Sequence, residues 1–209
     1  MEAFLDGKPL VIPRPTLACA LTVGVDAARA AGRIVVEVRG DGDVLGDDTL
    51  ASPSDEPGGV TRVELMSADP RALVRVTLGD AIDALRGLVG EQVRLAELVH
   101  TDQLQLAAGG LQDVFKTWHT VKDVVAQSGA LLDLELSDLD VGCEHGTLGQ
   151  ASNRLLVYLR GVKGSLERED WSALADILEV NLSEEAQRWE ELLTALSAHV
   201  SRMPVQKAS

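Results

Sequence analysis

The sequence predicts an α+β protein in which a small strand-containing head, residues 1–68, precedes a larger helical body. Proline and leucine divide the chain at the same place. No proline occurs between Arg71 and Met203, and six of the seven prolines come before that stretch. Because proline lacks the N–H that helix interiors need, this stretch can be continuous helix. Residues 1–68 contain 7 leucines, whereas residues 69–209 contain 25.

The head begins with the pattern of a β-hairpin and a capped helix. Residues 1–5 and 8–12 flank Asp6-Gly7, a two-residue sequence typical of hairpin turns. Thr16 is placed to cap a helix over residues 17–31, and Gly32 follows where a left-handed residue ends a helix.

Two further strands complete the head. Residues 33–39 form the clearest strand, and their alternation places Ile34, Val36 and Val38 on one face. Residues 46–59, rich in Asp, Ser, Pro and Gly, are expected to form a loop before a last strand over 60–66.

This order of strands and helix resembles the β-grasp, or ubiquitin-like, fold, and most closely its small sulfur-carrier versions. Members of that family act through an exposed C-terminal Gly-Gly whose carboxylate is activated. Here Gly58-Gly59 is internal, and the printed sequence ends Lys207-Ala-Ser209. The resemblance therefore implies a β-grasp-like head that binds or docks rather than one that carries sulfur.

The body, residues 69–200, reads as an antiparallel bundle of four or five helices. Asp69-Pro70 suits a helix entrance, because aspartate accepts from free N–H groups and proline donates none. Apolar residues then recur at spacings of three and four: Leu78, Ile82, Leu85, Val89, Val93, Ala96 and Val99. Glycine weakens a helix, so Gly79, Gly87 and Gly90 are expected to mark close helix packing.

The remaining helices follow from caps and spacing. A second helix is expected over about 103–132, and an acidic, glycine-containing connection over 133–147. Thr147 and Gln150 match a capping box for a third helix that ends near residue 168. Asp170 caps a fourth helix over 171–182, which Ser183 restarts or continues. Residues 201–209 are expected to form a frayed tail.

Charge and hydropathy narrow the classes of partner. The net charge is −14, with −5 over residues 1–68 and −9 over residues 69–209. Nucleic acid and anionic membranes are unexpected partners, because both are bound through Lys and Arg. The N-terminus lacks the basic and apolar regions of a secretion signal, and Cys19 and Cys143 are expected to be reduced thiols. The cytoplasm is therefore the expected compartment.

One loop contains groups that could carry chemistry. Gly142-Cys143-Glu144-His145-Gly146 combines a thiol, a carboxylate and an imidazole. Adjacent residues rarely converge on one ion, so His119 or His199 would have to complete a site through folding. We expect no catalytic residue, no metal site and no cofactor. A metal or thiol site at Cys143 and His145, making the protein an enzyme, stays the alternative.

The absence of an active-site motif favours a non-enzymatic interaction protein. The acidic, Leu-rich body resembles the export chaperones of flagellar and related secretion systems in composition and helix layout. That resemblance implies a chaperone-like adaptor that binds an amphipathic helix of another protein. The residues expected to bind the partner are Trp118, Trp171, Trp189, Glu184 and Glu185. A structural subunit of a homo-oligomer is a further alternative.

Overall fold

The computed structural model describes residues 1–204. The chain is α+β and divides into two compact units. One unit comprises Met1–Leu73 with the segment from Met203, and the other comprises Val74–Arg202. Within the first unit, Arg71 donates to the backbone oxygen of Met203 over 2.8 Å.

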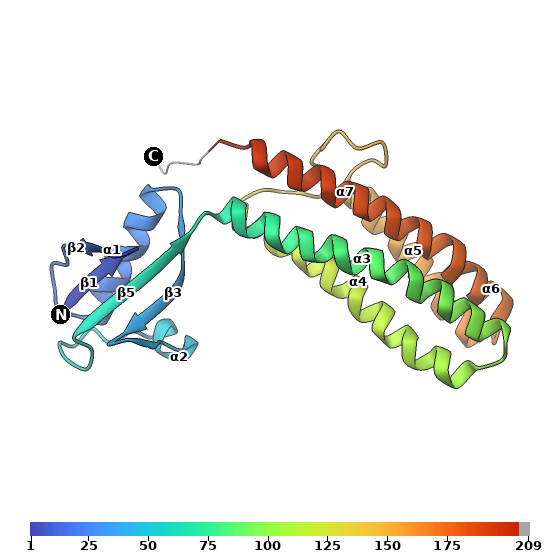
Figure 1. The fold of residues 1–209 in the computed structure, drawn as a ribbon, viewed down its shortest axis with the longest axis horizontal. Coiled ribbons are helices and arrows are strands. Elements are labelled where there is room, and N and C mark those ends of the chain that lie inside the picture. Colours follow the sequence, from blue (N-terminus) through green and yellow to red (C-terminus); the bar gives the residue numbers. More distant parts are fainter. Residues whose placement is uncertain (205–209) are drawn as a thin grey trace. The chain divides into compact units, whose positions relative to one another are not determined.

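The first unit is a five-stranded mixed sheet with a helix packed on it (Figure 1). Its strand order is β2-β1-β5-β3-β4. Strands β1 and β5 are parallel, and the other neighbours are antiparallel. The strands are β1 (Glu2–Leu5), β2 (Lys8–Leu10), β3 (Ile34–Gly40), β4 (Asp43–Val44) and β5 (Arg62–Ala68). The first hairpin thus forms where the sequence predicts it.

Helix α1 (Leu17–Ala30) packs its small residues against the sheet. The Thr16 hydroxyl accepts from the backbone N–H of Cys19, as the sequence predicts, and Gly32 takes a left-handed φ of 67°. Gly24 lies so close to Leu65 of β5 that an added Cβ would clash with its methyl groups. The core between helix and sheet consists of Ala3, Leu17, Ala20, Val38, Val63 and Leu65.

The first unit differs from the sequence expectation in several details. Strand β4 is a fifth strand that the sequence did not predict, and β5 lies two residues later than the expected strand over 60–66. Val36 does not share a face with Val38, because a bulge in β3 between Val35 and Glu37 shifts the register and leaves Val36 half-exposed. The expected loop over 46–59 contains a short helix, α2 (Asp47–Ala51), whose first turn carries two aspartates that favour a helix N-terminus.

The central strand β5 is held near both ends by aspartates from neighbouring turns. Asp41 accepts hydrogen bonds from the backbone N–H groups of Thr61 and Arg62, and Asp6 accepts from the N–H and hydroxyl of Ser67. Both aspartates have positive φ, which Asp tolerates better than most residues.

The second unit consists of long helices that lie side by side (Figure 1). Each of them carries buried apolar residues, and two of the helices each bury a tryptophan. The helices are α3 (Pro70–His100), α4 (Leu104–Leu132), α5 (Leu148–Glu167), α6 (Trp171–Asp176), the π-helical turn η1 (Ile177–Leu182) and α7 (Ser183–Arg202). The predicted capping box of Thr147 and Gln150 is present at the start of α5.

The expected role of the α3 glycines is wrong. A Cβ added at Gly79, Gly87 or Gly90 would meet no atom within 4 Å, so close packing does not explain them. The close approach occurs instead at Gly110 of α4, where an added Cβ would clash with Leu95 of α3. The α6 segment also differs, because helix 171–182 changes to π-type hydrogen bonding at Ile177 before α7 begins.

The predicted frayed tail lies mostly outside the described residues. Helix α7 extends to Arg202, two residues into the expected tail, and residues 205–209 are not described. Within residues 1–204, none of the helices combines the length and apolar character needed to cross a membrane.

The aspartates that hold β5 predict an acid-sensitive first unit. Hydrogen bonds from Ser67 lower the pKa of Asp6, and those from Thr61 and Arg62 lower the pKa of Asp41. A lowered pKa stabilises the folded state above the carboxyl's unfolded pKa of about 4, and this contribution is lost as the pH falls through the folded value.

We therefore expect Asp6→Asn and Asp41→Asn to lower the denaturant midpoint at pH 7 and to differ little from the unmodified protein near pH 2. Asp26→Asn, on the exposed side of α1, is the matched control and should change the midpoint at neither pH. Equal midpoints for all three variants at pH 7 would contradict the assignment.

Candidate functional site

Two tryptophans predicted to contact a partner lie inside the second unit. Trp118 of α4 and Trp189 of α7 are both 1% exposed. Their rings meet edge to face, with centroids 5.9 Å apart and planes at 74°. This geometry suits two aromatic quadrupoles, whose positive edges are attracted to negative faces. The pair therefore joins α4 to α7 in the core.

The contact also fixes which way the next residues of α7 point. Successive residues of an α-helix are rotated by about 100°. With Trp189 directed inward, Glu190 reaches Arg86 of α3 over 2.8 Å. Glu191 reaches His145 of the α4–α5 connection, where its Oε2 lies 2.7 Å from Nε2. Three consecutive side chains thus contact three different elements.

The α4–α5 connection, residues 133–147, is held against the helices along its length. Leu136 and Val141 are buried, the backbone N–H of Leu134 donates to Gly129, and that of Gly149 donates to Ser137. This anchoring, together with the capping box at Thr147, holds the short segment 142–146 beside α7.

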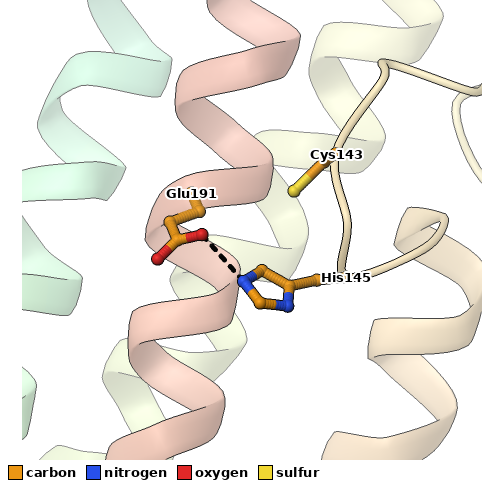
Figure 2. Close-up of side chains that lie close together, drawn as sticks. All are labelled: Cys143, His145 and Glu191. Carbon is orange, nitrogen blue, oxygen red and sulfur yellow. Dashed lines mark hydrogen bonds and ion pairs between the residues drawn. The ribbon is translucent and has the colours of Figure 1, made fainter.

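Cys143, His145 and Glu191 come together at this place (Figure 2). One ligand atom from each residue lies within 4.8 Å of those of the other two. The Cys143 thiol is half-buried and unpaired with Cys19, and both cysteines are free. The side chain of His145 is 28% exposed and that of Glu191 65%. The group is therefore open to water on one side.

The orientation of the imidazole distinguishes two kinds of chemistry. In a Cys-His-carboxylate triad, one ring nitrogen faces the sulfur and the other binds the carboxylate. Figure 2 shows the Cys143 sulfur and the Glu191 carboxylate on the same edge of the His145 ring, with Nδ1 directed away. The arrangement is unlike a triad. The Glu191 carboxylate lies at Nε2, the sulfur lies beside the same side of the ring, and the three donors are within 4.8 Å of one another.

Sequence reasoning expected no metal site, kept Cys143 and His145 only as an alternative, and missed Glu191. It looked for a third ligand among the histidines, yet His119 lies exposed on α4, 3.5 Å from Asp123, and neither it nor His199 belongs to the group. Glu191 is 46 residues from His145 and reads as an ordinary exposed glutamate. No local pattern in the sequence distinguishes it.

Trp171, the third predicted partner residue, lines an apolar pocket at the end of the second unit. This apolar end pocket has a volume of about 280 Å³. It lies between the α3–α4 turn and the start of α6. Figure 1 shows that these two segments are at the same end of the helices. The lining residues are Val99, Leu104, Gln105, Ala107, Ala108, Leu111, Leu166, Trp171 and Leu174.

The two predicted acidic residues have different environments. Glu184 is exposed and pairs with Arg188 over 2.9 Å. The side chain of Glu185 is fully buried, 3.2 Å from Arg154 of α5 and 3.4 Å from Arg188. Buried side chains offer no surface to a partner, so the predicted partner contacts of Trp118, Trp189 and Glu185 would need the helices to separate. That prediction stays untested.

A second, wider pocket of about 760 Å³ lies beside the α4–α5 connection. Its wall includes the C-terminal part of α4, the first residues of α5, and Trp189 at its inner side. Charged and apolar residues alternate along it, among them Lys122, Asp133 and Glu135. Ser137, Ser152 and Asn153 add polar groups to the same wall.

Comparison with known proteins gave no assignment: no protein-family model, no curated protein and no solved structure matches the chain.

The contrast between the neighbouring glutamates gives a stability prediction. Glu185→Gln should lower the free energy of unfolding by about 2–3 kcal/mol, because it leaves two arginines without their shared carboxylate. This is below the 3–5 kcal/mol of fully buried pairs, since Arg154 and Arg188 keep about a third of their side-chain surface in water.

Chemical denaturation of the full chain measures this difference. Glu184→Gln is the matched control on the same helix, and it should cost at most about 0.5 kcal/mol as an exposed pair. Equal losses for the two variants would contradict the structural role of Glu185.

Proposed function

We propose that the protein is a non-enzymatic, chaperone-like adaptor whose helical unit binds an amphipathic helix of another protein at the apolar end pocket. The observation that carries the proposal is the combination of this pocket with an acidic rim. Its lining is almost entirely apolar, and Trp171 stands half-buried at its edge. Aromatic side chains of this kind often anchor protein interfaces.

The size of the pocket favours side chains as its occupants. A volume of about 280 Å³ is just below the range of small-molecule pockets, which is roughly 300–1,000 Å³. Exposed leucines extend the apolar surface beside it, since Leu166 and Leu106 are 36% and 62% exposed. A pocket flanked by apolar surface suits one or two large side chains presented on a helix.

The charge around the pocket specifies the partner further. The α3–α4 turn carries Asp102, and the α5–α6 turn carries Glu167, Glu169 and Asp170. Arg168 is the one Lys or Arg in residues 101–103 and 167–170. Glu167 also pairs with Lys163 over 3.7 Å, and the Asp170 carboxylate accepts from the backbone N–H of Ala173. The remaining acidic excess of these turns attracts basic residues and speeds their association at low salt. The partner helix should therefore carry Lys or Arg beside its apolar anchor.

The two units also support finer fold assignments, which we propose here. A hairpin, a helix packed on one sheet face, and parallel pairing of the first and last strands support a β-grasp fold for the first unit. Long helices joined by short turns, except for the longer α4–α5 connection, support a four- or five-helix bundle for the second. Partner identification would test the predicted role in flagellar or secretion assembly.

The docking proposal is tested by site-specific cross-linking. A photo-cross-linking amino acid at Ala108, an exposed residue of the pocket lining, should capture a partner segment in the cells that make this protein. The same amino acid at Ala84, an exposed position of α3 outside both pockets, is the control. The captured segment should be amphipathic and basic.

Affinity for a synthetic peptide of that segment gives the second readout. Ala108→Arg should weaken binding at least about tenfold, because it fills the pocket and repels the basic flank, and Ala84→Arg should leave the affinity unchanged. Equal capture at both positions would contradict the proposal. Capture of a second copy of this chain would assign the pocket to self-association instead.

A further inference from the structure

We propose that Cys143, His145 and Glu191 form a zinc site, with the fourth coordination position open to water. This site is independent of the proposed adaptor function. It involves the α4–α5 connection and the middle of α7, whereas the apolar end pocket is lined by other residues. Failure of either proposal therefore leaves the other standing.

The donor set matches the chemistry of zinc. Zinc binds cysteine sulfur, histidine nitrogen and carboxylate oxygen, and sites with three protein ligands keep a water in the fourth position. Thiolate with imidazole favours zinc over magnesium and calcium, which prefer oxygen ligands. In residues 1–204, no other group of three or more His, Cys, Asp or Glu donors converges in this way.

The donor atoms are within reach of tetrahedral positions. Zinc–ligand bonds of 2.0–2.3 Å place donors about 3.3–3.7 Å from one another. The three donors here lie within 4.8 Å, and His145 Nε2 is already 2.7 Å from Glu191 Oε2. Movements of about 1 Å would give the tetrahedral spacing: His145 Nε2 and Glu191 Oε2 would move apart, and the Cys143 sulfur would move toward them.

The local backbone and side chains permit those shifts. Gly142 and Gly146 bracket the two loop donors, and both have the positive φ that glycine adopts readily. Glu191 is the most exposed of the three donors, so its carboxylate can rotate without disturbing the core. Its backbone is fixed by α7, where the inward Trp189 sets the direction of the side chain.

Binding requires one proton to leave. Cys143 binds zinc as the thiolate, so its Sγ–H proton passes to solvent. A neutral His145 binds through Nε2 as the Nδ1–H tautomer, so the proton that Nε2 shares with Glu191 is exchanged through solvent to Nδ1 and causes no further net release. No oxidant or reductant takes part.

The experiment uses the full chain without a polyhistidine tag, stripped of metal by a chelator and then titrated with Zn²⁺. We expect one zinc per chain. With Co²⁺ as the spectroscopic substitute, the protein should show a thiolate-to-metal charge-transfer band and the visible bands of a tetrahedral ion.

Three variants should change these readouts. Cys143→Ser should remove the charge-transfer band and weaken zinc binding at least about 100-fold, and His145→Ala and Glu191→Gln should weaken it at least about tenfold. Cys19→Ser and His119→Ala are the matched controls and should leave affinity and spectrum unchanged. Circular dichroism verifies that each variant remains folded.

A dissociation constant weaker than about 10 µM for the unmodified protein would overturn the proposal. So would a Co²⁺ spectrum that persists in folded Cys143→Ser, or equal losses in the control variants.

Discussion

The contact between Trp118 and Trp189 is the constraint on which the second unit depends. It fixes α7 about its own axis against α4, and each of the two tryptophans is only 1% exposed. The rotation it sets determines where the polar residues of α7 reach. Glu190 meets Arg86 of α3, and Glu191 meets His145 of the α4–α5 connection. A buried aromatic pair thus positions the carboxylate of the proposed zinc site.

Buried polar groups add a second constraint on the same helix. Glu185 is enclosed between Arg154 and Arg188, and the Ser183 hydroxyl lies near Gln92 of α3 while donating to Leu178 of the π-helical turn. Such groups cost free energy to bury unless they are paired, so they favour one arrangement of α3, α5 and α7 over others. The exposed features, the apolar end pocket and the loop of Cys143, lie on this rigid framework.

Local sequence signals predicted where helices begin. Features that depend on contacts between residues far apart in the sequence could not be predicted in this way. Thr16, Pro70, Thr147 and Asp170 act within a few residues, so their helix starts were foreseeable. The bulge at Val36 depends on pairing with β5, and the close approach at Gly110 depends on Leu95 of another helix. Glu191 joins Cys143 and His145 only through the orientation of α7, which the sequence near the loop does not encode.

A double-mutant cycle on the tryptophan pair measures the central constraint directly. The free energy of unfolding would be determined for the unmodified protein, for Trp118→Leu, for Trp189→Leu and for both together. Edge-to-face aromatic pairs contribute about 0.5–1.5 kcal/mol beyond the area they bury. The account predicts a coupling free energy in that range, with the double variant less destabilised than the sum of the single ones. Strictly additive losses would contradict it.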